Sequence, residues 1–177
     1  RRRLAAARRA GSLPAMAEPL SHFDPAGAAR MVAVTDKPET PRSAVAEVRV
    51  RMAPATLERI REGQIGKGDV LAVARLAAIT GAKQTPTLIP LCHPVRLTGV
   101  DVAFALEPEL PGVRATVRVT AVDRTGPEME AMTAATTAAL TIYDMCKAID
   151  RGIVIESAML VEKSGGKSGT WRRGDGP

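Results

Sequence analysis

Aromatic side chains are scarce in this sequence of 177 residues. They make up only 2% of it, as Phe23, Phe104, Tyr143 and Trp171. Hydrophobic residues still make up 45%, so we expect a globular core built from aliphatic side chains and methionine. The scarcity argues against nucleic-acid modules that stack bases on aromatic platforms. The length suits one domain with a sizeable core.

Cysteine and long apolar runs are also lacking. Cys92 and Cys146 lie far apart, without the spacing of metal ligands, and are too few for a disulfide framework. This usage is typical of a reduced, cytoplasmic protein. No run approaches the roughly 20 apolar residues of a membrane-spanning helix, and no secretory signal is recognisable.

The positive charge is unevenly distributed. The formal net charge is +6, and residues 1–15 contribute five positive charges with no acidic residue: Arg1, Arg2, Arg3, Arg8 and Arg9. Subtracting these five from six leaves +1 for residues 16–177, so we expect no binding to nucleic acid or membrane. Residues 1–15 are predicted to be a disordered extension, although their composition also resembles a transit peptide. Residues 16–170 should form a single domain and 171–177 a flexible tail.

Hydrophobic periodicity predicts an α+β fold. Apolar residues alternate over 45–52, 97–106 and 113–122, which predicts strands, and the turn at 107–112 makes the last two a hairpin. Helical spacing predicts helices over 54–63, from an N-cap at Asp69 to a stop at Gly81, and over 127–149. A final strand is expected over 153–161, and three prolines make 85–94 irregular. The order predicts a largely antiparallel sheet with helices packed on one face.

Asp144 and Lys147 are the first candidates for chemistry. They lie three residues apart near the end of the long predicted helix, where both side chains share one face. A glycine-rich segment with Lys163 and Lys167 follows, and its hydroxyls and ammonium groups suit a phosphate cradle, although the spacing is not that of a P-loop. The combination suggests acid–base chemistry on a phosphorylated substrate. A solvated ion pair followed by a linker has the same spacing.

Four other residues have both a functional and a structural interpretation. Lys67 precedes a predicted helix start, where an anion could bind, or it lies in a solvated turn. His93 lies in a proline-bounded loop that would hold an imidazole for proton transfer, although a lone histidine is more often structural. Glu128 and Glu130 open the long helix, where they stabilise its dipole or recognise a donor-rich group such as a guanine edge.

Five segments together resemble the cyclic pyranopterin monophosphate synthase family of molybdenum-cofactor biosynthesis. In chain order they are Lys67-Gly-Asp69-Val70, Leu88-Ile-Pro-Leu-Cys-His93-Pro94, Glu128-Met-Glu130-Ala131-Met-Thr-Ala-Ala135, Leu140-Thr-Ile-Tyr-Asp-Met-Cys-Lys147-Ala148 and Lys163-Ser-Gly-Gly-Lys-Ser-Gly169. The resemblance covers roughly residues 20–170. It implies a ferredoxin-like fold and a homo-hexamer, a trimer of dimers, with active sites at the dimer interface.

The resemblance also implies an activity. A lyase of this family converts 3',8-cyclo-7,8-dihydroguanosine triphosphate, a cyclised dihydro-GTP, to cyclic pyranopterin monophosphate and releases pyrophosphate. A radical S-adenosylmethionine GTP cyclase makes the substrate, and the step itself implies no metal or other cofactor.

Carried over residue by residue, the resemblance makes Asp144 and Lys147 the catalytic acid–base pair, with His93 and Lys67 as further active-site residues. It implies substrate binding by Leu91, Cys92, His93, Met129, Glu130 and Lys163. Glu128 and Lys167 join that set from their positions in the same motifs. We expect burial and nearby cations to lower the pKa of Lys147 toward neutrality, where it transfers protons efficiently.

One position departs from the family pattern. The family has Met-Val-Asp-Val-Ser where this chain has Met31-Val-Ala33-Val-Thr35, so a carboxylate is missing at Ala33. On a strand, Asp36 would face the opposite side and would be a poor replacement. An alternative function is therefore a catalytically impaired nucleotide-binding module on the same fold.

Overall fold

The computed structural model describes residues 28–175. The predicted extension over residues 1–15 lies outside this range. Residues 33–175 belong to one compact unit, and the fold below is that of this unit. Among the described residues, no helix has the length and hydrophobicity needed to cross a bilayer.

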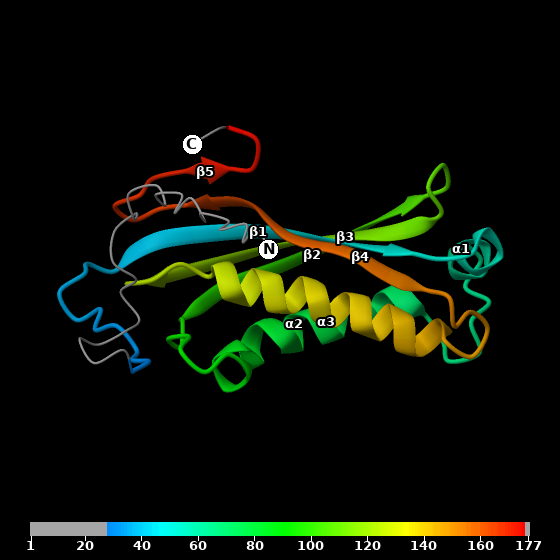
Figure 1. The fold of residues 1–177 in the computed structure, drawn as a ribbon, viewed down its shortest axis with the longest axis horizontal. Helices are drawn as coiled ribbons and strands as arrows, with labels where there is room; N and C mark the ends of the chain where they lie inside the picture. The colour runs from blue at the N-terminus through cyan, green and yellow to red at the C-terminus, as the bar shows by residue number, and fades with distance from the viewer. Residues whose placement is uncertain (1–27, 176–177) are drawn as a thin grey trace, which may run out of the picture. The chain divides into compact units, whose positions relative to one another are not determined.

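Within residues 28–175, five antiparallel strands form one sheet. They are β1 (Thr40–Arg51), β2 (Leu97–Glu107), β3 (Gly112–Asp123), β4 (Val154–Ser164) and β5 (Trp171–Arg172). Their order across the sheet is β2-β3-β1-β4-β5, so β1 is central (Figure 1). The β2–β3 hairpin is confirmed, with register from Leu106↔Val113 to Val100↔Val119. The α+β class with a largely antiparallel sheet is confirmed, and the arrangement is consistent with a ferredoxin-like fold.

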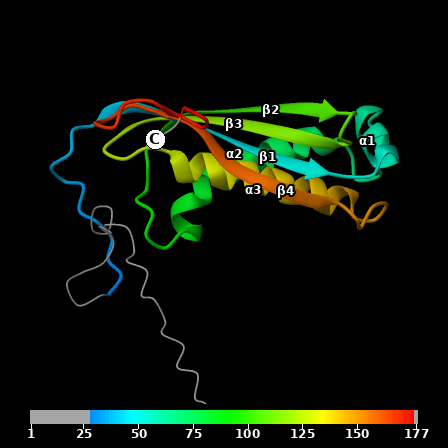
Figure 2. The same ribbon diagram turned by 45° about the horizontal axis from the view of Figure 1, so that its top comes forward.

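In the described part of the chain, three helices accompany the sheet: α1 (Pro54–Arg61), α2 (Val70–Leu88) and α3 (Glu128–Cys146). The two long helices, α2 and α3, run in opposite directions along one face of the sheet, as Figures 1 and 2 show from two angles. The core between helices and sheet consists mainly of alanine and valine, including Ala44, Ala46, Val48, Val50, Ala131, Ala134, Ala135 and Ala138. Such small side chains let α3 lie close to β1, which explains how the chain builds a core with few aromatic rings.

The predicted end of α2 at Gly81 is wrong, because the helix continues for seven more residues and includes Pro86. The glycine is explained by packing. A Cβ atom at Gly81 would lie 2.6 Å from Thr137 Oγ1 on α3, closer than real contacts allow. Gly81 therefore serves the contact between α2 and α3, and the irregular segment begins only at Ile89.

The C-terminal segment also differs from the prediction. Strand β4 extends to Ser164, and Trp171–Arg172 pairs with it as β5 where a flexible tail was expected over 171–177. Arg172 Nε donates to Glu162 Oε2 at 2.9 Å, which strengthens this short pairing. The glycine-rich segment 163–169 is therefore the turn between two paired strands.

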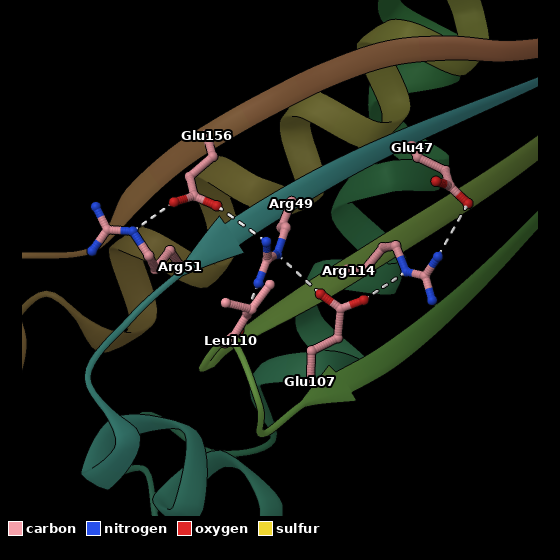
Figure 3. Close-up of polar contacts among 7 residues, drawn as sticks. All are labelled: Glu47, Arg49, Arg51, Glu107, Leu110, Arg114 and Glu156. Atoms are coloured by element: carbon pink, nitrogen blue, oxygen red, sulfur yellow. Dashed lines mark hydrogen bonds and ion pairs between the residues drawn. The ribbon is translucent and has the colours of Figure 1, made fainter. Parts of the chain in front are cut away.

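Charged side chains form a network on the sheet (Figure 3). Arg49 of β1 lies between two acids, 3.0 Å from Glu107 of β2 and 3.5 Å from Glu156 of β4. Arg51 Nε lies 2.6 Å from Glu156, and Arg114 Nε lies 3.0 Å from Glu107. Cross-strand pairs of opposite charge help to fix the neighbours of a strand. The network thus supports the order of β2, β3, β1 and β4.

Candidate functional site

Lys67, Asp144 and Lys147 lie together and are called here the acid–base cluster. Lys147 Nζ lies 2.6 Å from Asp144 Oδ1, and Lys67 Nζ lies 3.0 Å from Asp144 Oδ2. Lys67 also donates to the backbone carbonyl of Asp144 at 2.8 Å. One carboxylate thus holds two ammonium groups, one from its own helix and one from 77 residues earlier in the chain.

Two local features place the cluster. Asp144 lies in the last turn of α3 and Lys147 is the residue that caps this helix. Lys67 lies in the turn before α2, where Gly68 has φ of 101° and donates its N–H to the Ile65 carbonyl at 2.8 Å. The predicted N-cap at Asp69 is confirmed, since its carboxylate accepts hydrogen bonds from the first turn of α2. A lysine at the C-terminus of α3 also complements the helix dipole.

The electrostatics of the cluster contradict one expectation. The hydrogen bond from Lys147, followed by that from Lys67, lowers the pKa of Asp144 to about 2. The same hydrogen bond raises the pKa of Lys147 rather than lowering it toward neutrality. The expected burial is absent, because the Lys147 side chain is 51% exposed. Lys147 is therefore an ammonium group at neutral pH, suited to donating a proton or stabilising an anion.

A cavity of about 890 Å³ lies among the 36–42 segment, the β3–α3 connection and the glycine-rich turn, and is called here the basic cavity. Its charged lining has five cations and two acids: Lys37, Arg42, Arg124, Lys163, Lys167, Asp36 and Glu128. Lys163 Nζ lies 3.4 Å from Glu128 Oε1. Because cations outnumber acids, the cavity suits a polyanion such as a phosphate chain.

The glycine-rich turn is shaped for this cavity. Gly165 and Gly166 have φ of 97° and 70°, values that favour glycine. A Cβ atom at Gly165 would overlap the carbonyl oxygen of Pro41, and one at Gly166 would overlap the guanidinium of Arg42. The two glycines therefore allow the backbone that carries Lys163 and Lys167 to lie against the start of β1.

Glu130 and Cys92 form a buried pair near the start of α3. Glu130 is only 1% exposed, and the Cys92 Sγ atom lies 3.9 Å from its Oε1. Burial raises the pKa of both the Glu130 carboxyl and the Cys92 thiol. Among the described residues, none hydrogen-bonds to Glu130 Oε2. Its environment thus favours a neutral carboxyl group, which both donates and accepts hydrogen bonds.

The predicted site residues fall into two groups at opposite ends of α3. Glu130 and Asp144 are separated by roughly 21 Å of helix, at 1.5 Å per residue. His93 and Leu91 lie beyond the C-terminal end of α2, whereas Lys67 precedes its start. Met129 and Leu91 are exposed, at 40% and 37%. A single chain therefore brings Lys67 to Asp144 and Lys147, and Lys163 to Glu128, but does not unite the two groups.

Sequence reasoning missed Lys37, Arg42 and Arg124, which line the basic cavity together with Asp36. The strand considered for Asp36 is absent, because residues 33–39 form no strand and the Lys37 N–H donates to the Val34 carbonyl in a turn. Ala33 itself is exposed. The run Thr-Asp-Lys-Pro has turn composition, which is the signal that would have placed Asp36 correctly.

Comparison with known proteins identifies a family and a relative that this chain resembles. The profile of the MoaC family matches residues 31–166. A cyclic pyranopterin monophosphate synthase from Thermomicrobium roseum is 56% identical over 160 residues, which cover 90% of this chain and 96% of that protein.

Proposed function

The chain belongs to the MoaC family, and from this premise we propose that it acts as a cyclic pyranopterin monophosphate synthase, a lyase of molybdenum-cofactor biosynthesis. The likeness to the Thermomicrobium roseum synthase over almost the whole chain is the observation that carries this proposal. The acid–base cluster and the basic cavity supply the two kinds of group that the reaction needs.

The proposed substrate is a cyclised dihydro-GTP, with its triphosphate in the basic cavity. Lys163 and Lys167, together with Arg42 and Arg124, would neutralise the charge that develops as pyrophosphate leaves. Glu128 and the buried Glu130 lie at the same end of α3 and would face the guanine-derived base with Leu91, Cys92 and Met129. His93, in the adjoining loop, would complete this end of the site.

Proton transfer is assigned to the acid–base cluster. Lys147 is held as an ammonium by Asp144 and would donate a proton to the substrate as a general acid. Asp144 orients the ammonium, and Lys67 holds the other oxygen of that carboxylate. Once Lys147 has given up its proton, the neutral amine can recover one from the substrate in a later step, so the same group serves as acid and base.

We propose that a second copy of the chain completes each site, in the homo-hexamer, a trimer of dimers, that the family resemblance implies. The two groups are too far apart along α3 to contact one small molecule within one chain. Between Glu130 and Asp144 the helix carries no charged residue, and Leu140 there is 55% exposed. An uncharged helix surface between two half-sites is suited to packing against another copy.

The cellular setting belongs to the same proposal. Cys92 and Cys146 are free thiols, as a reducing cytoplasm would keep them. A radical S-adenosylmethionine GTP cyclase would supply the substrate. The roles proposed for these residues do not need a metal ion.

Turnover of enzymatically prepared cyclised dihydro-GTP tests the function, with pyranopterin fluorescence after oxidation as the readout. The chain and its Ala33→Asp variant are compared. Activity of the unmodified chain supports the synthase and shows that alanine is tolerated. Activity of Ala33→Asp alone identifies a disabled form, and inactivity of both folded proteins favours the alternative, a nucleotide-binding module.

A further inference from the structure

Asp123 lies at the end of β3 and accepts hydrogen bonds from Arg42, Arg96 and Arg124, of which Arg42 and Arg124 line the basic cavity. Its Oδ2 accepts the backbone N–H of Arg96 at 2.9 Å, and its Oδ1 accepts that of Arg124 at 2.8 Å. Its backbone carbonyl accepts a hydrogen bond from Arg42 Nε at 2.9 Å. The Asp123 side chain is only 17% exposed. It does not itself line the cavity, although two of its partners do.

Each contact fixes a different part of the proposed site. The Arg96 amide is three residues after His93, so its bond anchors the end of the loop that carries Leu91, Cys92 and His93. The Arg124 amide begins the connection that leads to Glu128 and Glu130 at the start of α3. The bond to Arg42 aims a guanidinium that lines the cavity.

We propose that Asp123 is a positioning residue that aligns the His93 loop with the basic cavity. This inference rests on the proposed function for the identity of the substrate. The Asp123 carboxylate accepts the N–H of its chain neighbour Arg124 and that of Arg96, 27 residues earlier, and so ties the end of the His93 loop to the start of the β3–α3 connection. Arg96 is held from a second side by its ion pair with Glu39, which keeps the loop end in place between two acids.

The role predicts an effect on binding more than on the chemical step. The basic cavity lies at the start of α3, whereas Lys147 and Asp144 lie at its end. A shift of the cavity walls should therefore weaken the hold on the triphosphate while the proton-transferring groups keep their geometry. Loss of a hydrogen bond to a charged group lowers affinity by roughly 10- to 100-fold.

Asp123→Asn is the decisive variant, because asparagine has nearly the same shape. It keeps one oxygen that accepts a backbone N–H, but places an NH2 group, which cannot accept, against the other backbone N–H. Asp123→Ala removes both bonds. The control is Glu156→Gln, which removes a carboxylate bound to Arg49 and Arg51 in the network of Figure 3. For each we would measure kcat and KM with cyclised dihydro-GTP, the affinity for inorganic pyrophosphate by calorimetry, and hydrogen exchange at the Arg96 and Arg124 amides.

We expect Asp123→Asn to raise KM and the pyrophosphate Kd about 10- to 100-fold, to change kcat much less, and to speed exchange at both amides. Glu156→Gln should leave all of these unchanged. If KM, pyrophosphate affinity and amide exchange in Asp123→Asn match those of the control, the positioning role is refuted. A fall in kcat with unchanged KM and pyrophosphate affinity also refutes it.

The same experiment separates this inference from the proposed function. Failure of the unmodified chain to bind pyrophosphate or turn over substrate counts against the function. In that event the amide exchange still decides whether Asp123 holds the two segments. If Asp123→Ala does not fold, Asp123→Asn alone decides the outcome.

Discussion

The Lys147 ammonium lies 2.6 Å from the Asp144 carboxylate, three residues earlier on the same helix. This spacing makes the pair a helix-face ion pair, of a kind that is common on protein surfaces. The second carboxylate oxygen distinguishes it, because Lys67 binds there from the turn before α2. Asp144 therefore has two cationic partners, which explains both its low pKa and the fixed position of Lys147.

Asp144→Asn should reduce turnover about 100- to 10,000-fold, the usual effect of disabling a general acid–base group. The loss of the negative charge should also lower the pKa of Lys147, since Asp144 is the first cause of its rise. The basic limb of the pH–rate profile should then move to lower pH. Because the pKa of Asp144 is about 2, its own ionisation should produce no acidic limb at ordinary assay pH. Steady-state rates across pH measure both effects.

The matched control for this variant is Glu58→Gln. Glu58 is an exposed acid paired with Arg61 three residues later on α1, and it lines no cavity described here. Glu58→Gln should leave the turnover rate and the pH–rate profile unchanged. An unaltered basic limb in Asp144→Asn would show that Lys147 is not the group that titrates there.

Lys147→Ala should abolish turnover yet leave assembly and pyrophosphate binding largely intact, because the basic cavity lies at the other end of α3. Lys147→Arg keeps a positive charge beside Asp144 but cannot release a proton in the usual pH range. We therefore expect Lys147→Arg to be inactive as well.

Recovery of activity in Lys147→Arg would mean that the residue stabilises charge without transferring a proton. Loss of assembly in Lys147→Ala would contradict its assigned role. Size-exclusion chromatography and calorimetry accompany the rate measurement.

Gly165→Ala should weaken pyrophosphate binding and raise KM, because its Cβ atom would overlap the Pro41 carbonyl at the edge of the basic cavity. The turn that carries Lys163 and Lys167 would have to move. Gly169→Ala is the control in the same turn. Gly169 also has a positive φ, of 65°, but nothing lies within 4 Å of a Cβ atom there. Both variants place a side chain on a backbone of positive φ, which costs about 1–2 kcal/mol, but only at Gly165 does the new Cβ atom overlap another atom. Equal pyrophosphate affinities in the two variants would contradict the packing argument.

The sheet was largely predictable from the sequence, because its signal is periodic. Residues 113–122 alternate strictly, and the strand found, Gly112–Asp123, differs by one residue at each end. The end of α2 was not predictable. In the local sequence Gly81 looks like a glycine that ends a helix, whereas the reason for it is the close contact with Thr137, which lies on another helix. Strand β5 has only two residues, and its pairing depends on the turn before it rather than on any pattern.

The motifs indicated candidate residues but not their arrangement, and they did not indicate Lys37, Arg42 or Arg124 of the basic cavity. The motifs indicated Lys67, Asp144 and Lys147, while only the fold shows that both lysines bind the carboxylate of Asp144. The separation of Glu130 from Asp144 was already implied by the predicted helix, at roughly 1.5 Å per residue. The pKa of Lys147 could not be predicted, because its direction depends on exposure and on the distance to Asp144.

Asp150→Ala should destabilise the protein by about 1 kcal/mol, as removal of a helix cap does. Its carboxylate accepts the Ala53 N–H at 2.9 Å and the Thr56 hydroxyl at 3.1 Å, and so joins the start of α1 to the turn after α3. The melting temperature should fall by roughly 2 to 4 °C. Asp101→Ala, at an exposed aspartate on β2, is the control and should change little.

The effect of Asp150 should depend on pH in one direction. Its hydrogen bonds, that from Ala53 first, lower the pKa of its carboxyl group in the folded protein. A depressed carboxyl pKa contributes stability above the pKa of the unfolded chain, and this is lost as pH falls through the folded value. The difference in melting temperature between the unmodified chain and Asp150→Ala should be full at neutral pH and shrink below about pH 4. A difference that grows on acidification would contradict this account.

Gly81→Ala should lower stability, although alanine is the better helix former by about 1 kcal/mol. The new Cβ atom would lie 2.6 Å from Thr137 Oγ1 and 3.0 Å from Thr137 Cβ. The hydroxyl cannot easily move, because it donates to the Thr133 carbonyl at 2.8 Å. Overpacking of this kind costs about 1–3 kcal/mol, which outweighs the gain in helix propensity.

The double variant Gly81→Ala/Thr137→Ala tests whether contact with Thr137 causes the loss of stability. It removes the Thr137 hydroxyl but keeps the β-carbon of residue 137. It should recover part of the loss relative to Gly81→Ala, so that the two changes are not additive. Turnover should follow, since the contact between α2 and α3 sets the distance from Lys67 at the start of one helix to Asp144 at the end of the other. A higher melting temperature for Gly81→Ala would show that helix propensity, not contact with α3, governs this position.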